Sequence, residues 1–265
     1  MNEKPKERWG MGELYERYVG RWSRLVAREF LDWLSVPEGK RWVDVGCGTG
    51  GLVEGILRAY APSEVIGIDR AEGFLAQARR TITDPRVRFE LGDALDLPLA
   101  ADVCDVTVSG LVLNFVPDHR AMAQEMVRVT KPGGKVAAYV WDYAGGMEMM
   151  RYFWDAAVAV SPQAVQLDQG ERFPLCQPQP LHALFQDLGL TSVSVRAIDI
   201  PTVFQDFADY WMPFLGQQGS APTYLATLDE ETREQIRQLL QARLMPQADG
   251  TIALSARAWA VQGVV

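Results

Sequence analysis

The first part of the chain alternates between short apolar runs and stretches whose apolar residues recur every three or four positions. Short apolar runs are typical of buried strands, and the longer spacing is typical of amphipathic helices. The expected strands, in chain order, cover residues 41–45, 64–68, 87–90, 104–108 and 136–141. Helices are expected over 51–59 and 71–82, and after Asp118, a good N-cap residue. Strands that alternate with helices in this way favour a doubly wound parallel sheet.

Two segments beside this alternation contain strong glycine or proline signals. Residues 11–34 have helical spacing, which Gly20 is expected to divide into two helices before a turn at 36–39. The segment 131–134, Lys-Pro-Gly-Gly, is expected to break the chain before the fifth strand begins.

Beyond Trp141 the alternation weakens. The pattern then predicts an irregular insertion, a sixth strand, a second insertion and a closing strand, over 142–180, 191–200, 201–250 and 251–261 respectively. Within the second insertion, the capping-box pattern from Thr227 to Glu230 predicts the start of a helix. Excursions this long in a compact domain are usually lids or binding elements.

Composition narrows the class of protein. The chain has 265 residues, of which 48% are apolar and 23% charged, as expected for one large folded domain or a domain with an insertion. Its net charge of −8 argues against a nucleic-acid partner. The three cysteines lack the spacing of a disulfide framework or a metal site, so we expect a reduced, cytoplasmic protein without metal. Neither an export signal nor an apolar run of about 18 residues occurs, so no membrane span is expected.

The most informative segment is a glycine-rich turn after the first strand. Read literally, Gly46, Gly48 and Gly51 match the dinucleotide fingerprint G-x-G-x-x-G. Asp44, however, stands two positions before the first glycine, where its carboxylate would repel a pyrophosphate and attract an ammonium group. Charges a few ångströms apart make that sign worth on the order of kilocalories per mole. S-Adenosylmethionine has such an ammonium group, together with a sulfonium.

Two further acidic residues follow predicted strands. Asp69 ends the second strand, where a carboxylate can accept hydrogen bonds from both hydroxyls of a ribose. NAD and S-adenosylmethionine share this feature, so Asp69 indicates an adenosine without choosing between them. After the third strand, Asp93 and the adjacent backbone can contact the exocyclic amine and a ring nitrogen of adenine.

The ordered motifs resemble those of a known family. They are VDVGCGTG, VIGIDRA, GDALDLP, DVTVSGLVLNFVPD and KPGG. Together they resemble the class I S-adenosylmethionine-dependent methyltransferases, especially the small-molecule group similar to the ubiquinone and menaquinone C-methyltransferases. The resemblance covers residues 10–141 well and 181–200 weakly. It implies an α/β fold with a doubly wound, seven-stranded, mostly parallel sheet of order 3-2-1-4-5-7-6, an antiparallel seventh strand and helical insertions as a lid.

The same resemblance implies which residues bind S-adenosylmethionine. They are Asp44, Gly46, Cys47 and Gly48 for the methionine part, Asp69 and Arg70 for the ribose and adenine edge, Asp93, Ala94 and Leu95 for the base, Ser109 and Gly110 for the methyl end, and Tyr18 in a helix over the cofactor. Many relatives have a histidine after the fourth strand, where this chain has Leu113-Asn114. No catalytic residue is therefore assigned.

The expected organisation is a core with three additions. N-terminal helices over 1–35 cover the cofactor, residues 36–141 and 181–265 form the Rossmann-like core, and 142–180 with 201–250 form the acceptor pocket. The expected reaction is methyl transfer to a small, apolar or aromatic acceptor by a monomer or homodimer. An NAD(P)-dependent oxidoreductase and a non-catalytic protein that binds S-adenosylmethionine remain as alternatives.

Overall fold

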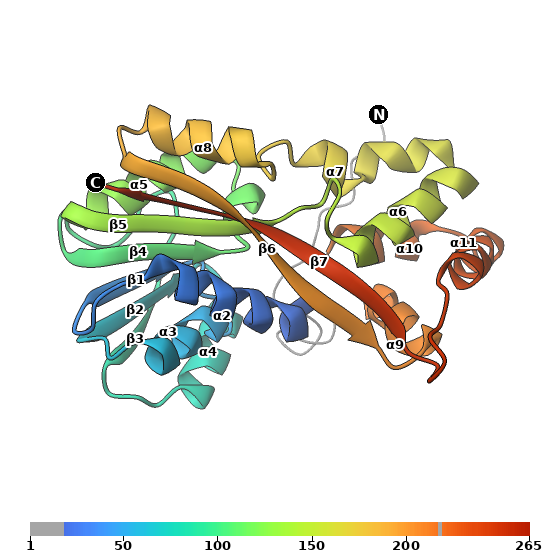
Figure 1. Ribbon diagram of the computed structural model, residues 1–265, viewed down its shortest axis with the longest axis horizontal. Coiled ribbons are helices and arrows are strands. Elements are labelled where there is room, and N and C mark those ends of the chain that lie inside the picture. Colours follow the sequence, from blue (N-terminus) through green and yellow to red (C-terminus); the bar gives the residue numbers. More distant parts are fainter. Residues whose placement is uncertain (1–18, 217–218) are drawn as a thin grey trace. The chain divides into compact units, whose positions relative to one another are not determined.

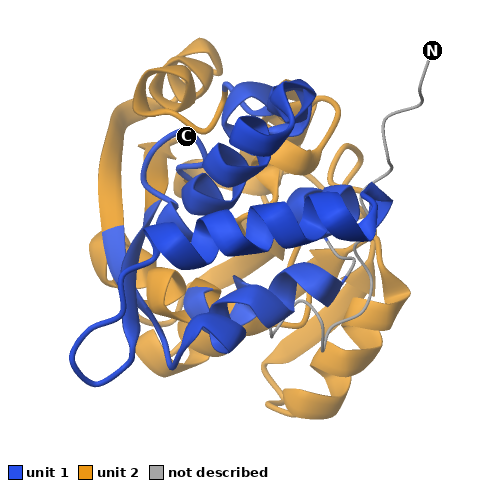
Figure 2. Cartoon of the chain, turned by 90° about the vertical axis from the view of Figure 1, so that its right-hand side faces the viewer, with its two compact units in different colours: residues 1–22, 141–174, 199–257 blue, residues 23–140, 175–198, 258–265 orange. Residues whose placement is uncertain are grey.

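The computed structural model describes residues 19–216 and 219–265. These residues fall into two compact units (Figure 2). Unit 1 contains the residues up to Trp22 together with 141–174 and 199–257, and unit 2 contains 23–140, 175–198 and 258–265.

Seven strands form one sheet (Figure 1). They are β1 (Arg41–Val45), β2 (Glu64–Asp69), β3 (Val87–Leu91), β4 (Cys104–Gly110), β5 (Thr130–Trp141), β6 (Thr191–Phe204) and β7 (Ile252–Val264). Their order is β3-β2-β1-β4-β5-β7-β6, which confirms the order that the family resemblance implied. β1 to β4 lie wholly in unit 2, whereas β5, β6 and β7 have residues in both units.

The order in which the parallel strands are added to the sheet reverses at β1. This strand pairs in parallel with β2 on one side and with β4 on the other, and Asp44 faces Gly67 and Val108 in the two registers. The next strands along the chain extend the sheet first through β3 and then through β5. In doubly wound sheets, ligands bind at the carboxyl ends of the strands where the order reverses. The carboxyl ends of β1 and β4 are therefore the expected site.

The seventh strand is antiparallel to its neighbour, as the resemblance implied. Gly133 donates its N–H to Val265 O at one end of the pairing, and Asp142 donates to Arg257 O at the other. The partner numbers fall as the β5 numbers rise, so the two segments run in opposite directions.

The helices of unit 2 begin and end close to the residues expected from the sequence. They are α2 (Arg21–Leu34), α3 (Gly51–Ala59), α4 (Glu72–Thr81), α5 (His119–Val129) and α8 (Pro178–Asp187), with a short 3₁₀ helix η2 (Leu113–Phe115). Asp118 caps α5 by accepting a hydrogen bond from the Ala121 N–H at 2.9 Å, as predicted. α2 begins directly after Gly20, and the first of the two N-terminal helices that we expected lies outside the described residues.

Unit 1 is mostly helical around an aromatic core. It contains α6 (Glu148–Val160), η3 (Pro162–Leu167), α7 (Gln169–Arg172), α9 (Phe207–Trp211), η4 (Met212–Gly216), α10 (Ser220–Thr227) and α11 (Glu230–Arg243). Phe153 stacks on Phe214 with ring centroids 4.6 Å apart, and Tyr210 packs against both Phe204 and Phe214. These aromatic side chains are buried and form the core of the unit.

Three local expectations were wrong. The segment 142–180 is not irregular, because α6 spans thirteen residues of it and buries a continuous apolar face. The sixth strand does not end at Ile200 but runs to Phe204. Alternate side chains are buried from Ile198 to Phe204, as in a strand with one buried face. α11 is capped by Asp229, whose carboxylate accepts from the Thr232 N–H at 2.7 Å, whereas the Thr227 hydroxyl binds the Tyr224 carbonyl.

The glycine-proline segment before the fifth strand also differs from expectation. It does not precede β5 but lies inside it. Thr130 pairs with Cys104 and Lys135 pairs with Val106, so four residues of β5 lie between positions that are two apart on β4. Gly133, with φ of +78°, takes up the extra length, and the strand continues past it as a bulge.

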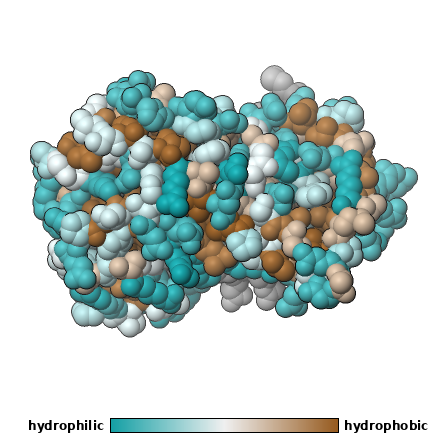
Figure 3. All heavy atoms as spheres, viewed as in Figure 1, coloured by the Kyte–Doolittle hydropathy of each residue, from teal (hydrophilic) through white to brown (hydrophobic). Residues whose placement is uncertain are grey.

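The exposed apolar side chains are scattered over the surface. Figure 3 shows polar residues over much of one face, with several separate apolar patches among them. The most exposed large apolar side chains are far apart in sequence, at Leu91, Met212 and Met245. No helix within 19–216 or 219–265 is long and apolar enough to cross a membrane.

Candidate active site

A buried carboxylate lies at the carboxyl end of β1. The side chain of Asp44 is only 1% exposed, and neither of its oxygens has a hydrogen-bond partner among the described residues. Burial, and secondarily the nearby charge of Asp69, raise the pKa of Asp44 to about 8. A buried carboxylate without a partner is costly in free energy unless a ligand supplies a donor or a positive charge.

The glycine turn that follows is held in shape by its own N–H groups. Gly46 and Cys47 both donate to Ile68 O, at 2.7 and 3.0 Å, and Gly50 donates to Cys47 O at 2.9 Å. The Gly48 N–H donates to the Asp69 carboxylate at 2.9 Å. These four N–H groups therefore bind the end of β2 and the turn itself. These four N–H groups are therefore not available to bind a phosphate.

The glycines that the turn requires are not those of the dinucleotide fingerprint. Gly46, Gly48 and Gly50 all have positive φ, at +77°, +53° and +90°. Gly51 begins α3 with ordinary helical geometry, and a methyl group there would meet nothing within 4 Å. The turn is thus built as G-x-G-x-G, and the third glycine of the literal fingerprint match has no structural requirement.

Asp69 lies at the end of β2 and joins two loops. Its carboxylate accepts the Gly48 N–H and, at 2.8 Å, the Ala71 N–H. One oxygen of Asp69 is thus tied to each loop, and its remaining lone pairs can accept from a ligand hydroxyl. Arg70 beside it is exposed. Cys47 is buried, and burial followed by the charges of Asp44 and Asp69 raises the pKa of its thiol, so it packs as a neutral side chain.

The loop after β3 forms a tight turn. The Asp93 carboxylate accepts the Leu95 N–H at 3.0 Å, and Asp93 pairs with Asp96 in a short antiparallel bridge. The Asp93 side chain is exposed, and Ala94 and Leu95 are half-buried. This turn presents backbone and one carboxylate at the end of β3, as a base-binding turn requires.

The end of β4 lies against the glycine turn. Ser109 is fully buried and donates its hydroxyl to Val45 O at 2.8 Å, so its side chain links β4 to β1. A methyl group at Gly110 would lie 2.5 Å from Tyr139 Oη, and one at Gly46 would lie 2.6 Å from Val112 Cγ2. Both glycines are therefore required by close packing, and the segment after β4 lies directly on the turn after β1.

The structure brings most of the expected site residues together at the ends of adjacent parallel strands. Asp69 is hydrogen-bonded to the turn at Gly48, its charge acts on Asp44, and Ser109 is bonded to the same strand as Asp44. Tyr18 lies outside the described residues. Two features were missed from the sequence: the internal bonding of the loop N–H groups and the burial of Asn114 without a partner. No cluster of metal-ligating side chains occurs in the described part of the chain.

Comparison with known proteins gives a match in this region. Residues 43–138 match the family described as "Methyltransferase domain", from within β1 to within β5, and this range includes every site residue above except Tyr18. The sheet order agrees with the one that the resemblance to class I S-adenosylmethionine-dependent methyltransferases implied.

Two relatives of similar sequence are methyltransferases. The chain is 31% identical over 159 residues to trans-aconitate 2-methyltransferase of Variovorax paradoxus, covering 60% of both chains. It is 39% identical over 135 residues to demethylmenaquinone methyltransferase of Halalkalibacterium halodurans, covering 47% of this chain and 55% of the relative. The matched regions thus span 60% or less of the length of these two relatives.

Solved structures share the fold. A Haloferax volcanii methyltransferase in complex with the Trm112 activator superposes with a TM-score of 0.57 at 22% identity, covering 96% of this chain and 93% of the other. Phosphoethanolamine N-methyltransferase 2 of Haemonchus contortus, solved with S-adenosylhomocysteine, gives a TM-score of 0.60 at 17% identity, covering 95% of this chain and 56% of the other. At these identities the likeness supports the fold alone.

Proposed function

We propose that the protein transfers a methyl group from S-adenosylmethionine to a small, apolar or aromatic acceptor. The observation that carries this proposal is the unpartnered carboxylate of Asp44 at the point where the sheet order reverses. A positively charged amino group fits a buried carboxylate, whereas a pyrophosphate would be repelled by it. Four N–H groups of the turn, those of Gly46, Cys47, Gly48 and Gly50, are already bonded within the protein.

The remaining groups of the cofactor find matching residues along the sheet. Asp69 would accept from the ribose hydroxyls, with Arg70 nearby, and the turn from Asp93 to Leu95 would hold the adenine. The methionine part would lie against Gly46–Gly48, close to the end of β4 at Ser109 and Gly110. When bound, the cofactor supplies a methyl group already activated by sulfonium. The chain would then contribute mainly by orienting the two reactants, which can lower a barrier by up to about 7–11 kcal/mol.

The acceptor class is inferred from the relatives and from the aromatic composition of the added segments. The named relatives act on trans-aconitate and demethylmenaquinone, both small molecules. We assign residues 142–180 and 201–250 to an acceptor pocket, residues 1–35 to a cover over the cofactor, and 36–141 with 181–265 to the core. We further expect a cytoplasmic monomer or homodimer that does not bind nucleic acid.

Calorimetry with both classes of cofactor tests the proposal. The expected result is micromolar binding of S-adenosylmethionine or S-adenosylhomocysteine and none of NADH. Binding of NADH alone would instead support an oxidoreductase. Release of S-adenosylhomocysteine across a panel of small acceptors would then distinguish an enzyme from a protein that only binds the cofactor.

Asp69 provides a residue-level test. Asp69→Ala removes the expected ribose contact and also the bond that holds the Gly48 N–H, so it is expected to weaken both cofactor binding and the glycine turn. Asp69→Asn keeps one carbonyl oxygen and is expected to lose less affinity. Unchanged affinity in both variants would refute the ribose assignment.

A further inference from the structure

A second polar side chain is buried without a partner in the same unit as Asp44. Asn114 lies in η2, four residues after the end of β4, and is 9% exposed. Neither the nitrogen nor the oxygen of its carboxamide has a hydrogen-bond partner among the described residues. Leaving both groups unbonded is unfavourable, and in native proteins such a group often has a functional explanation.

The position of Asn114 is fixed by a strained segment. Leu111 has φ of +63°, a left-handed conformation that is costly for a leucine, and its N–H donates to Tyr139 O at 2.8 Å. Val112 packs against Gly46, and the Phe115 N–H donates to Val112 O at 2.8 Å. Strain of this kind is concentrated at functional sites. The chain is thus held in place on both sides of the unbonded carboxamide.

The segment that carries Asn114 borders the point where the sheet order reverses. Asp44 on β1 is opposite Val108 on β4, and six residues later the chain reaches Asn114. Val112, between them in sequence, contacts the turn that follows Asp44. The two unpartnered side chains therefore lie on the two strands, and the segments following them, that flank the expected ligand site.

The Asn114 carboxamide differs from the acidic residues because it is neutral and can both donate and accept hydrogen bonds. In the proposed function, the ammonium group, the ribose hydroxyls and the adenine of the cofactor already have matching residues at the ends of β1, β2 and β3. Asn114 follows β4, is neutral, and offers one acceptor and two donors in fixed positions. It cannot take a proton, so it suits recognition of an oxygen that donates and accepts, such as a hydroxyl or enol, rather than base catalysis.

We propose that the Asn114 carboxamide, buried and unbonded beside the carboxyl ends of β1 and β4, binds a hydroxyl or carbonyl oxygen of the methyl acceptor and thereby determines acceptor specificity. This inference rests on the proposed methyl-transfer function. It restricts the acceptor to molecules with such an oxygen close to the methylated atom, and it makes Asn114 a positioning residue for the acceptor.

Substitution separates this role from a structural one. Asn114→Leu replaces the carboxamide by an apolar group of similar size, so the melting temperature of the protein is expected to rise. Its affinity for S-adenosylhomocysteine is expected to stay within threefold of the wild type, while its affinity for 1-naphthol, used as a hydroxyl-bearing probe, falls tenfold or more. As a control, Asp118→Ala loosens the same segment by removing the α5 cap. This control is expected to lower the melting temperature and to leave both affinities within threefold.

The carboxamide can also be observed directly. The chain contains only two asparagines, Asn2 and Asn114, so labelling with ¹⁵N-asparagine gives two side-chain amide signals that the Asn114→Leu variant assigns. With S-adenosylhomocysteine bound, 1-naphthol is expected to shift the Asn114 signal and 1-methylnaphthalene, which lacks the hydroxyl, to leave it in place.

Each other outcome overturns the inference. A tenfold loss of S-adenosylhomocysteine affinity in Asn114→Leu would assign the carboxamide to the cofactor. If 1-naphthol causes no shift, or if both naphthalenes cause equal shifts, the Asn114 carboxamide does not bind the oxygen of the acceptor. Failure of the wild type to bind S-adenosylhomocysteine at all would instead overturn the proposed function, so the two failures are distinguishable.

Discussion

The two charged residues of β1 lie three positions apart and have opposite surroundings. Arg41 begins the strand, and its guanidinium contacts Glu64 at 2.5 Å and Val103 O at 3.0 Å while remaining one-third exposed. Asp44 lies near the end of the strand, is almost completely buried and has no partner among the described residues. Arg41, which water can reach, has a partner of opposite charge, whereas the buried Asp44 has none.

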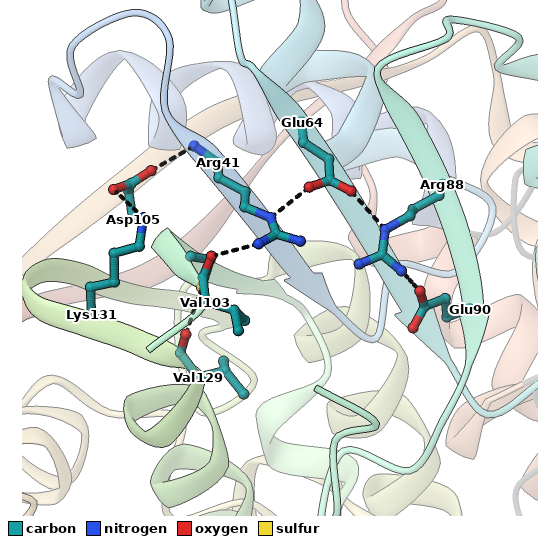
Figure 4. Close-up of polar contacts among 9 residues, drawn as sticks. Arg41, Glu64, Arg88, Glu90, Val103, Asp105, Val129 and Lys131 are labelled. Carbon is teal, nitrogen blue, oxygen red and sulfur yellow. Dashed lines mark hydrogen bonds and ion pairs between the residues drawn. The ribbon is translucent and has the colours of Figure 1, made fainter. Parts of the chain in front are cut away.

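The amino end of the sheet continues this paired arrangement across several strands (Figure 4). Glu64 binds Arg88 at 2.7 Å, and Arg88 also contacts Glu90. On the other side of β1, Asp105 accepts the Arg41 backbone N–H at 2.9 Å and pairs with Lys131 at 3.2 Å. Each carboxylate in this ladder has a cationic partner.

This contrast separates groups that serve folding from groups that serve a ligand. Partial burial acts to raise the pKa of Glu64, but the hydrogen bond from Arg88 and the charges of Arg41 and Arg88 outweigh it and lower that pKa. Burial without any partner raises the pKa of Asp44 instead. A side chain that costs stability in the empty protein requires a different explanation, and a cationic ligand provides one.

Neutralising Asp44 should change ligand binding more than any other substitution. Asp44→Asn keeps the shape of the side chain but removes the charge, so we expect S-adenosylhomocysteine affinity to fall a hundredfold or more, about 3 kcal/mol. Isothermal calorimetry measures this loss. Affinity within threefold of the wild type would show that the ammonium group does not bind here and would leave the buried carboxylate without explanation.

The next largest effect is expected at the glycines of the turn. Gly46→Ala places a methyl group against Val112 at a backbone φ of +77°, so we expect about 2 kcal/mol lower stability and a clear loss of cofactor affinity. Gly51→Ala is the matched control, because it lies in a helix with open space around it and is expected to be neutral or stabilising by up to about 1 kcal/mol. Denaturant unfolding of both variants tests this. Equal losses would restore the G-x-G-x-x-G interpretation.

Much of unit 2 could be predicted because its chemistry is local. The short apolar runs predicted the strands, and Asp118 as a cap predicted the start of α5. The G-x-G-x-G geometry was harder to predict, because a string of glycines does not reveal which of them have positive φ.

The rest depended on contacts between distant residues. Nothing in the sequence around Lys131–Gly134 indicates that Val265 will pair there and carry the strand through a glycine-proline segment. The two partners of Asp69 and the unbonded state of Asn114 depend likewise on loops that meet only in the folded chain. Unit 1 was predicted least well, because its aromatic residues mark a core without specifying which helices enclose it.

The raised pKa of Asp44 predicts that ligand affinity depends on pH. Below about pH 8 the empty site holds a proton that a bound ammonium group must displace, so affinity should rise by up to about tenfold per pH unit between pH 6 and 7.5. At higher pH the amino group of the ligand itself loses its proton, so the affinity should level off above about pH 8 and then fall. Calorimetry in buffers of different ionisation enthalpy should detect the release of about one proton for each ligand bound at pH 7.

The stability of the empty protein should change in the opposite sense. Because the folded state keeps the Asp44 proton up to about pH 8 while the unfolded state loses it near pH 4, the contribution of Asp44 to stability falls as pH rises between these values. Asp44→Asn should therefore be more stable than the wild type at pH 9 and similar to it near pH 4. A binding profile that is flat from pH 6 to 8 would contradict the assignment.

The smallest expected effect lies at the paired end of the sheet. Glu64→Gln removes the carboxylate that joins Arg41 to Arg88, and because the group is partly exposed we expect a loss of only about 0.5–1 kcal/mol of unfolding free energy. The lowered pKa of Glu64 means that this contribution is present above about pH 4.5 and disappears as pH falls further, and salt should weaken it. Denaturant unfolding at two salt concentrations measures the loss, and the S-adenosylhomocysteine affinity should not change. An affinity loss as large as that of Asp44→Asn would mean that the ladder also supports the ligand site, and the division between the two ends of β1 would fail.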